Sequence, residues 1–205
     1  MREIAGEYPL LHAPHRWEWA PFDVQFSTEI PPDEFVQSVH VVGFIDDRIV
    51  VCRDQRPDVW FLPGGTREPG ESIDDCLVRE LREEAGARIS GSFHPIGAHV
   101  GMAESSGPYR PHLPHPRVAW LWGYADVAVE GVPTNPRGGE QIEEVRVVEV
   151  ADARRLLVLE NVWMAELIDM ALALRDQPER FEQQPGRAAG VIPGRDAPGR
   201  SRGAT

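Results

Sequence analysis

Residues 64–87 read GGTREPGESIDDCLVRELREEAGA, a glycine-rich turn followed by a stretch with helical periodicity. Ser72 is a residue type that caps helix N-termini, and Asp75 stands three residues later, as in a capping box. Gly86 is placed to end the helix. We therefore expect a loop that ends at Ser72 and a helix over residues 73–85.

The acidic side chains of this expected helix lie beside its apolar stripe. On a helical wheel, Glu80, Glu83 and Glu84 form one cluster at the edge of the stripe. Like charges at this spacing repel by roughly a few tenths of a kcal/mol, and by more near a core, so the cluster requires compensation. Mg²⁺ provides it, because this ion prefers carboxylate oxygen and is completed by water and phosphate. The alternative is an ordinary solvated helix surface. The stripe consists of Ile73, Leu77, Leu81 and Ala85.

The spacing of particular residue types across this stretch is specific. Gly65 is followed after five residues by Glu71, and Glu71 after seven residues by the run RELREEAG at 79–86. The pattern resembles the Nudix box of the Nudix hydrolase family. Ala87 is one departure, because the family usually has a bulky aliphatic residue at what resembles a packing position. The order of the surrounding elements also resembles the family, over about residues 35–175.

The resemblance implies a divalent metal site. Carried over to this sequence, Glu80, Glu83 and Glu84 bind a catalytic Mg²⁺ or Mn²⁺, and the carbonyl of Gly64 or Gly65 lies nearby. A chain with a negative net charge repels a polyphosphate, so local cations must override that repulsion for a substrate to bind.

The resemblance also implies an ion pair between Arg79 and Glu71 that holds the loop against the helix, beside Gly65. A charge-assisted hydrogen bond between a guanidinium and a carboxylate suits a loop that must keep its shape. These residues are therefore expected to orient the site rather than to react.

The activity implied by the resemblance is hydrolysis of a diphosphate bond by a water molecule that attacks phosphorus. One carboxylate takes the proton of that water. Glu83 is our first choice, and Glu140 is the best alternative among the later acids, which also include Glu143 and Glu144. The substrate is expected to be a nucleoside triphosphate or a nucleotide sugar such as ADP-ribose. A Nudix-fold sensor that binds a nucleotide without turnover is the alternative function.

Candidate contacts to the substrate lie outside the box. Residues 107–116 contain four prolines, which excludes a regular helix or central strand and indicates a loop. Tyr109 and Arg110 in this loop are candidates for touching phosphate or base. Trp60, just before the Pro-Gly-Gly turn, either stacks on a base or belongs to the core. The same alternative applies to an alternating stripe of Trp120, Trp122 and Tyr124.

The remaining elements indicate an α/β fold with a mixed β-sheet covered on both faces, and the resemblance implies a Nudix-like α/β/α sandwich. The chain divides into an aromatic and proline-rich N-terminal extension at 1–32, a Nudix-like domain at 33–177 and a disordered tail at 178–205. Strands are expected over 35–46, 47–53, 59–62, 89–100, 118–129 and 145–150, and further helices over 151–159 and 162–174.

Composition excludes several other classes. The chain has 205 residues, 21 of them Lys or Arg and 33 Asp or Glu, with a formal net charge of −12. This charge argues against a long nucleic-acid partner or a membrane surface. No apolar run reaches membrane-spanning length, no secretory signal pattern is present, and the two cysteines are too few for a disulfide framework. We expect a cytoplasmic protein. The N-terminal extension either pairs two copies as a homodimer or folds back on a monomer, and the sequence favours neither.

Overall fold

The structure is a computed structural model that describes residues 6–17, 22–159 and 161–176. The tail expected at 178–205 lies outside the described residues, as do parts of the N-terminal extension. Within the described ranges, no helix is both long enough and apolar enough to span a membrane.

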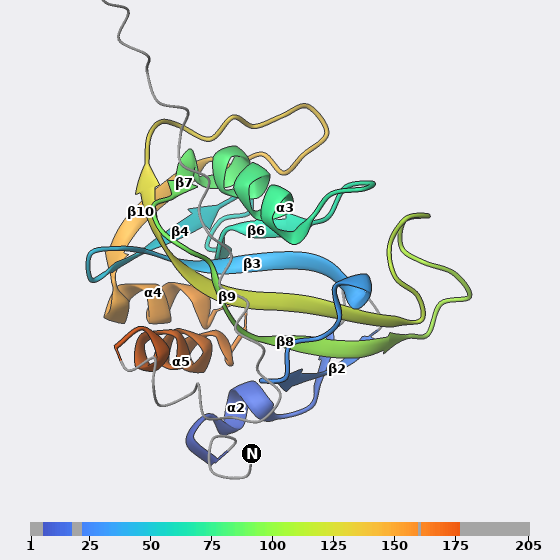
Figure 1. Ribbon diagram of the computed structural model, residues 1–205. Helices are drawn as coiled ribbons and strands as arrows, with labels where there is room; N and C mark the ends of the chain where they lie inside the picture. The colour runs from blue at the N-terminus through green and yellow to red at the C-terminus, as the bar shows by residue number, and fades with distance from the viewer. Residues whose placement is uncertain (1–5, 18–21, 160, 177–205) are drawn as a thin grey trace, which may run out of the picture.

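A single large sheet organises the fold, with ten strands and a central order of β1-β2-β8-β9-β3-β4-β10 (Figure 1). β5 pairs with β4, β6 with β3, and β7 with β9. The strands are β1 (His15–Trp17), β2 (Phe22–Ser27), β3 (Val36–Ile45), β4 (Arg48–Arg53), β5 (Trp60–Phe61), β6 (Gly64–Thr66), β7 (Ala87–Ile89), β8 (His94–Ala103), β9 (Arg117–Val129) and β10 (Glu144–Glu149).

The sheet is mixed, as the sequence predicts. β3 and β9 run parallel, from Val36 opposite Ala119 to Phe44 opposite Asp126. The other described pairs are antiparallel. A parallel pair requires a long crossover. Here the chain between β3 and β9 contains the helix of the Nudix-box stretch, residues 73–85, which we call the box helix. The topology thus places the box helix over the middle of the sheet.

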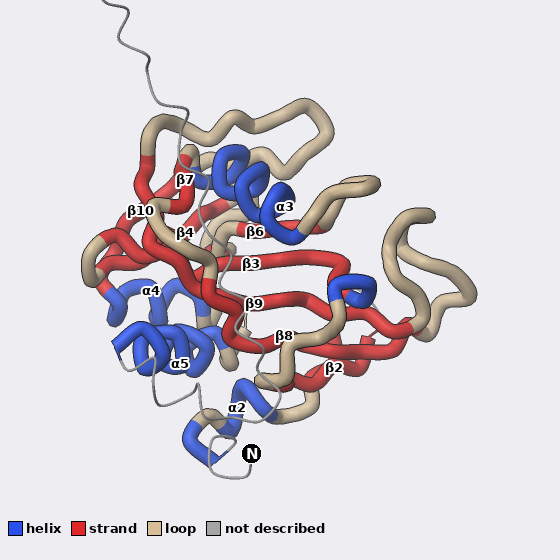
Figure 2. The backbone as a smooth tube through the Cα atoms, viewed as in Figure 1, coloured by secondary structure: helices blue, strands red, loops and turns tan. Residues whose placement is uncertain are grey.

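Helices cover both faces of the sheet, which confirms the expected layers. Helix α3 (Ile73–Glu80) lies on one face, and α4 (Val150–Leu157) and α5 (Met164–Asp176) lie together on the other (Figures 1 and 2). A short helix, α2 (Pro9–His12), contacts α5 and β2. Two buried apolar clusters correspond to the two faces, one under α3 and one under α4 and α5.

The box helix begins where the sequence predicts and changes geometry before it ends. The backbone N–H of Asp75 donates to Oγ of Ser72 at 3.0 Å, which is the expected N-cap. Residues Leu81–Ala85 continue the helix as a π-helical turn, closed by a bond from the Gly86 N–H to the carbonyl of Leu81. Gly86 has φ +59°, a left-handed conformation that favours glycine.

The structure differs from the expected elements at two places. The strand expected over 89–100 is interrupted between β7 and β8, because residues 90–92 read SGS and offer no apolar side chain to the sheet. The Pro-Gly-Gly turn is followed by a strand, β6, which pairs with β3 and was not expected. The other expected strands and helices agree with the structure to within about two residues.

The N-terminal extension contributes to the sheet. β2 pairs with β8 along its whole length, from Phe22 opposite Ala103 to Ser27 opposite Ala98. Alternate β2 side chains are buried in the cluster under α4 and α5. Trp120 and Trp122 belong to the same cluster and are buried, so they follow the core alternative rather than the base-stacking one.

Candidate active site

The glycine turn and the box glutamates are packed against each other. Because β6 pairs with β3, Gly64 and Gly65 are held as strand residues beneath the box helix. The N–H of Gly64 donates to Oε2 of Glu84 at 2.9 Å. A Cβ at residue 65 would stand only 2.4 Å from Oε1 of Glu80, so a larger residue there would displace the Glu80 side chain or the turn. The turn is therefore shaped to receive two carboxylates.

The three box glutamates differ in their burial. Glu80 and Glu84 are only 8% and 5% exposed, whereas the Glu83 side chain is 25% exposed. Glu83 and Glu84 both stand in the π-helical turn, a geometry that recurs at functional sites. Glu83 is thus the box glutamate with the best access to solvent.

Arg79 connects the box residues into one network. Its guanidinium forms two hydrogen bonds with the carboxylate of Glu71, at 2.8 and 3.0 Å. Nη1 of Arg79 also contacts Glu80 at 2.7 Å and Glu83 at 3.3 Å. Nη2 donates to the carbonyl of Thr66 at 3.0 Å, which ties the network to the loop. The structure therefore brings Arg79 and Glu71 together between loop and helix.

The site carries more negative charge than its protein partners offset. Burial raises the pKa of Glu84 well above its usual range, the Gly64 N–H opposes this, and the charges of Glu80, Glu140 and Glu83 raise it further. Burial also raises the pKa of Glu80, against the hydrogen bond from Arg79. Within the described residues, Arg79 is the cation that pairs with Glu80 and Glu83, and no cation pairs with Glu84.

The glutamates do not form a ready metal cage. Among the described residues, no three His, Cys, Asp or Glu groups are gathered closely enough to hold an ion. Nη1 of Arg79 contacts both Glu80 and Glu83, in the position where a shared cation would compete with it. Carboxylate oxygens in excess of the nearby cations suit a hard divalent cation. These glutamates can therefore hold such an ion once Nη1 of Arg79 moves away from Glu80 and Glu83.

The loop acid Glu140 lies on the same side as the box. It is exposed in the segment between β9 and β10, and desolvation followed by the charge of Asp54 raises its pKa. Its charge also contributes to the raised pKa values of Glu84 and Cys52, which burial dominates. Cys52 in turn donates to the carbonyl of Glu84 at 3.4 Å. Glu140 is therefore an electrostatic neighbour of the buried box glutamate.

Among the described residues, no hydrogen bond or ion pair joins the expected substrate contacts to the box glutamates. Tyr109 is 72% exposed, with the guanidinium of Arg110 5.6 Å from the centre of its ring. Trp60 is 4% exposed and belongs to the core cluster on the α4 face, where Arg146 covers its ring at 4.5 Å. Of the two roles considered for Trp60, base stacking or core packing, its burial agrees with core packing.

Two cavities lie beside the single 3-10 turn at Asp33–Phe35, on either side of it. One cavity, of about 410 Å³, lies between two loops: residues 67–72, which precede the box helix and are called the box loop, and the proline-rich loop at 107–116. Arg67, Glu71 and His112 contribute to its wall. The ring of His112 contacts the carbonyl of Arg67 at 2.9 Å, which docks one loop on the other. Arg67 is a wall residue that sequence reasoning missed, although its place inside the box loop was a usable signal.

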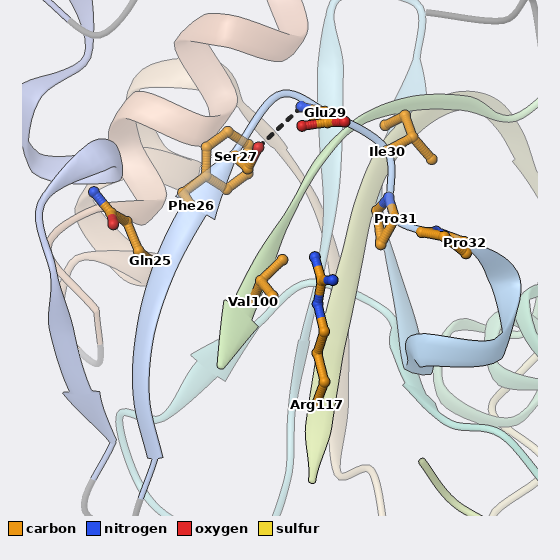
Figure 3. A pocket seen from close by; sticks show the side chains of 9 residues that line it. All are labelled: Gln25, Phe26, Ser27, Glu29, Ile30, Pro31, Pro32, Val100 and Arg117. Carbon is orange, nitrogen blue, oxygen red and sulfur yellow. Dashed lines mark hydrogen bonds between the residues drawn. The ribbon is translucent and has the colours of Figure 1, made fainter. Parts of the chain in front are cut away.

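The second cavity, of about 470 Å³, opens between the end of β2 and the strands β8 and β9 (Figure 3). Arg117 projects into it between Val100 and Pro31, and its guanidinium lies 4.9 Å from the ring centre of Phe35. Within the described part of the chain, no carboxylate pairs with Arg117. No sequence pattern points to Arg117, because the opposite wall of the cavity comes from the N-terminal extension.

Comparison with known proteins gives a consistent result. The family model for the NUDIX domain matches residues 34–170. The NAD-capped RNA hydrolase NudC of Pseudomonas putida (strain W619) is 29% identical over 166 residues, which cover 78% of this chain and 52% of that protein. The uncharacterized Nudix hydrolase YvcI of Bacillus subtilis (strain 168) is 43% identical over 44 residues, 22% of this chain and 28% of that protein.

A solved structure shares the fold. The pyrophosphohydrolase BsRppH of Bacillus subtilis superposes with a TM-score of 0.50 and 18% identity, covering 66% of this chain and 76% of that one. The chain spans about half the length of NudC and a smaller part of YvcI. Because the family model covers most of the chain and the box residues are assembled on the expected helix, this protein belongs to the NUDIX domain family.

Proposed function

We propose that this protein hydrolyses a diphosphate bond in a nucleotide derivative, with a divalent cation such as Mg²⁺ or Mn²⁺. The observation that carries the proposal is the unbalanced group of carboxylates around Glu84, for which Arg79 is the described cationic partner. The name of the NudC relative, an NAD-capped RNA hydrolase, supports a nucleotide substrate.

We assign Glu80, Glu83 and Glu84 to the cation, together with the backbone of Gly64 or Gly65. Binding requires Nη1 of Arg79 to leave Glu80 and Glu83, while its two bonds to Glu71 can persist. A bound divalent cation neutralises charge on phosphate oxygens and lowers the pKa of water. Arg79 then keeps loop and helix in register.

The proton of the attacking water requires a carboxylate base. Glu83 is our first assignment, because it is more exposed than Glu80 and Glu84 and becomes available when Nη1 of Arg79 leaves it. Glu140 is the alternative, because it stands on an exposed loop near Glu84. A base positioned at the attacking water contributes about 10²- to 10⁴-fold to the rate.

The organic half of the substrate is assigned to the side of the site where the proline-rich loop meets the box loop. Tyr109 and Arg110 stand at the exposed part of that loop, and the cavity with Arg67 and His112 lies at its base. Arginine side chains suit phosphate oxygens, and an exposed tyrosine suits a nucleobase.

A panel of substrates tests the proposal. It contains nucleoside triphosphates, ADP-ribose, NAD and a short NAD-capped RNA, each with Mg²⁺, with Mn²⁺ and with EDTA. We expect phosphate or mononucleotide release with a divalent cation and none with EDTA. The acidic net charge predicts slower hydrolysis of the capped RNA than of free NAD. Tight nucleotide binding without turnover of any compound would contradict hydrolysis and favour the sensor alternative.

A further inference from the structure

The segment that carries Glu140 is an ordered loop with its own closing contact. Residues 130–143 connect β9 to β10 and pass on the α3 side of the sheet (Figure 1). Most of these residues are exposed, and Glu140 itself makes no described hydrogen bond. The position of its carboxylate therefore depends on how the surrounding backbone is held.

Asn135 closes this loop at Ile142, and Gln141 adds two bonds inside it, from Nε2 to the carbonyls of Pro136 and Gly139 at 3.0 and 3.3 Å. Oδ1 of Asn135 accepts a hydrogen bond from the N–H of Ile142 at 2.8 Å, and its Nδ2 donates to the carbonyl of Ile142 at 3.0 Å. The Asn135 amide thus satisfies both backbone groups of Ile142, as a neighbouring strand would. Asn135 has φ +45°, a conformation that asparagine and glycine tolerate better than other residues.

The far end of the closure is anchored beneath the box helix. Ile142 is 5% exposed and belongs to the same core cluster as Cys52, Leu81 and Ala85. Inside the loop, the N–H of Gly139 donates to the carbonyl of Pro136 at 3.1 Å. The Asn135 closure therefore fixes a compact loop to the core that supports the box glutamates.

Glu140 stands two residues before the anchored end. Because Ile142 packs with Leu81 and Ala85 and the loop passes on the α3 side of the sheet, Glu140 lies on the side that carries the box glutamates (Figure 1). An exposed loop without a closing contact would let this side chain sample many positions, at a cost in ordering entropy for each turnover.

We propose that Asn135 is a positioning residue that holds Glu140 on the side of the sheet that carries the box carboxylates, by bonding both backbone groups of Ile142. The inference rests on the proposed hydrolysis and on a catalytic part for Glu140. Asn135 touches neither the box residues nor the reacting atoms; it acts through the loop.

Asn135→Gly tests the proposal, because glycine accepts the positive φ while both hydrogen bonds are lost. We expect kcat to fall at least tenfold on the panel nucleotide that the wild-type protein hydrolyses fastest, with KM changed less than threefold. Asn135→Asp keeps the acceptor for the Ile142 N–H, so its kcat should lie between those of the wild-type protein and Asn135→Gly. Val132→Ala is the matched control, because Val132 is 82% exposed in the same loop and should leave kcat unchanged.

A double-mutant cycle separates positioning from general damage to the fold. In a Glu140→Gln background, Asn135→Gly should cause no further loss of kcat. An equal loss in both backgrounds would show a merely structural role and overturn the inference, as would full activity in Glu140→Gln. If Asn135→Gly does not fold, Asn135→Asp carries the same cycle. If the wild-type protein is active and Asn135→Gly has the same kcat, only this inference is overturned. If the wild-type protein hydrolyses no compound of the panel, both proposals are overturned.

Discussion

The two faces of the sheet bury ionisable groups in opposite ways. Under α3, Glu80 and Glu84 are buried beside Arg79 and the Gly64 N–H, which stabilise the charged carboxylates. Under α4 and α5, His99 is fully buried, and neither ring nitrogen has a hydrogen-bond partner within the described residues. Within the described residues, the buried carboxylates of the α3 face therefore have hydrogen-bond partners, whereas the buried imidazole of the other face has none.

The environment of His99 is aromatic. The ring centroid of Trp163 lies 4.4 Å from that of His99. The centroids of the Phe26 and Trp17 rings lie 5.3 and 5.4 Å from it. Burial, followed by the neighbouring histidines His15, His12 and His40, lowers the pKa of His99 to about 3. Burial favours the neutral imidazole here, so His99 contributes packing. On the α3 face burial also raises the pKa of Glu80 and Glu84, but hydrogen bonds from Arg79 and from Gly64 oppose it.

The largest expected effect belongs to Glu83 on the charged face. Glu83→Gln should lower kcat by about 10²- to 10⁴-fold, because it removes the proposed base while keeping the size of the side chain. Steady-state hydrolysis with Mg²⁺ measures the loss, and circular dichroism checks the fold. Glu130→Gln is the matched control, because Glu130 pairs with Arg88 on the exposed surface. Equal activity of the two variants would remove Glu83 from the reaction.

The next effect tests whether the glycine turn is shaped around a carboxylate. In Gly65→Ala the new Cβ would stand 2.4 Å from Oε1 of Glu80, so the side chain or the turn must shift. We expect a stability loss of about 1–3 kcal/mol, as for other overpacked sites, together with lower activity. Denaturant unfolding measures the stability. Gly91→Ala should cost less than about 0.5 kcal/mol, because its Cβ would meet nothing within 4 Å.

The third effect is a pH dependence on the aromatic face. The folded pKa of His99, about 3, lies below the ordinary value of 6.5, so the unfolded chain binds one more proton between these values. Stability from this group is complete above pH 6.5 and falls by about 1.4 kcal/mol per unit as the pH decreases below it. Unfolding of wild type and His99→Phe from pH 8 to 4 measures the difference, and parallel curves would refute it.

The carboxylates on the other face act in the opposite direction. Burial raises the folded pKa values of Glu80 and Glu84, so their contribution weakens as the pH rises above the unfolded value. Subtracting the His99→Phe curve from that of wild type removes this shared background. The difference curve should therefore report the aromatic face alone.

The smallest effect concerns the start of the box helix. Ser72→Ala removes the acceptor for the Asp75 N–H and should cost about 1 kcal/mol of stability, with little change in kcat. Thermal unfolding measures it. Ser90→Ala is the control, because Ser90 lies in an exposed turn and its side chain caps no helix. A Ser72→Ala variant as stable as the control would mean that tertiary packing alone defines the helix start.

Local sequence signals explain why the box helix and its glutamates could be predicted. The cap at Ser72, the stop at Gly86 and the spacing of Glu80, Glu83 and Glu84 act within one or two helical turns. Such signals depend little on the rest of the chain. The π-helical turn could not be predicted in this way, because its extra residue reflects how the helix end packs on the sheet.

The substrate contacts show the limit of that reasoning. Trp60 and Tyr109 were selected by residue type. The structure buries Trp60 in the core and leaves Tyr109 exposed. Arg117 and Asn135 carry no sequence signal of their own. Their surroundings come from β2 and from Ile142, and contacts between distant segments cannot be deduced from local periodicity.

The sequence by itself determined the family, the box helix, the mixed layers and the identity of the acids that meet at the glycine turn. Tertiary structure decided which acids are buried, that Arg79 bridges Glu71, Glu80 and Glu83, and that the N-terminal extension joins the sheet through β2. The reason is physical: caps, turns and helical spacing are encoded over a few residues, whereas burial and charge compensation depend on which segments the folded chain brings together.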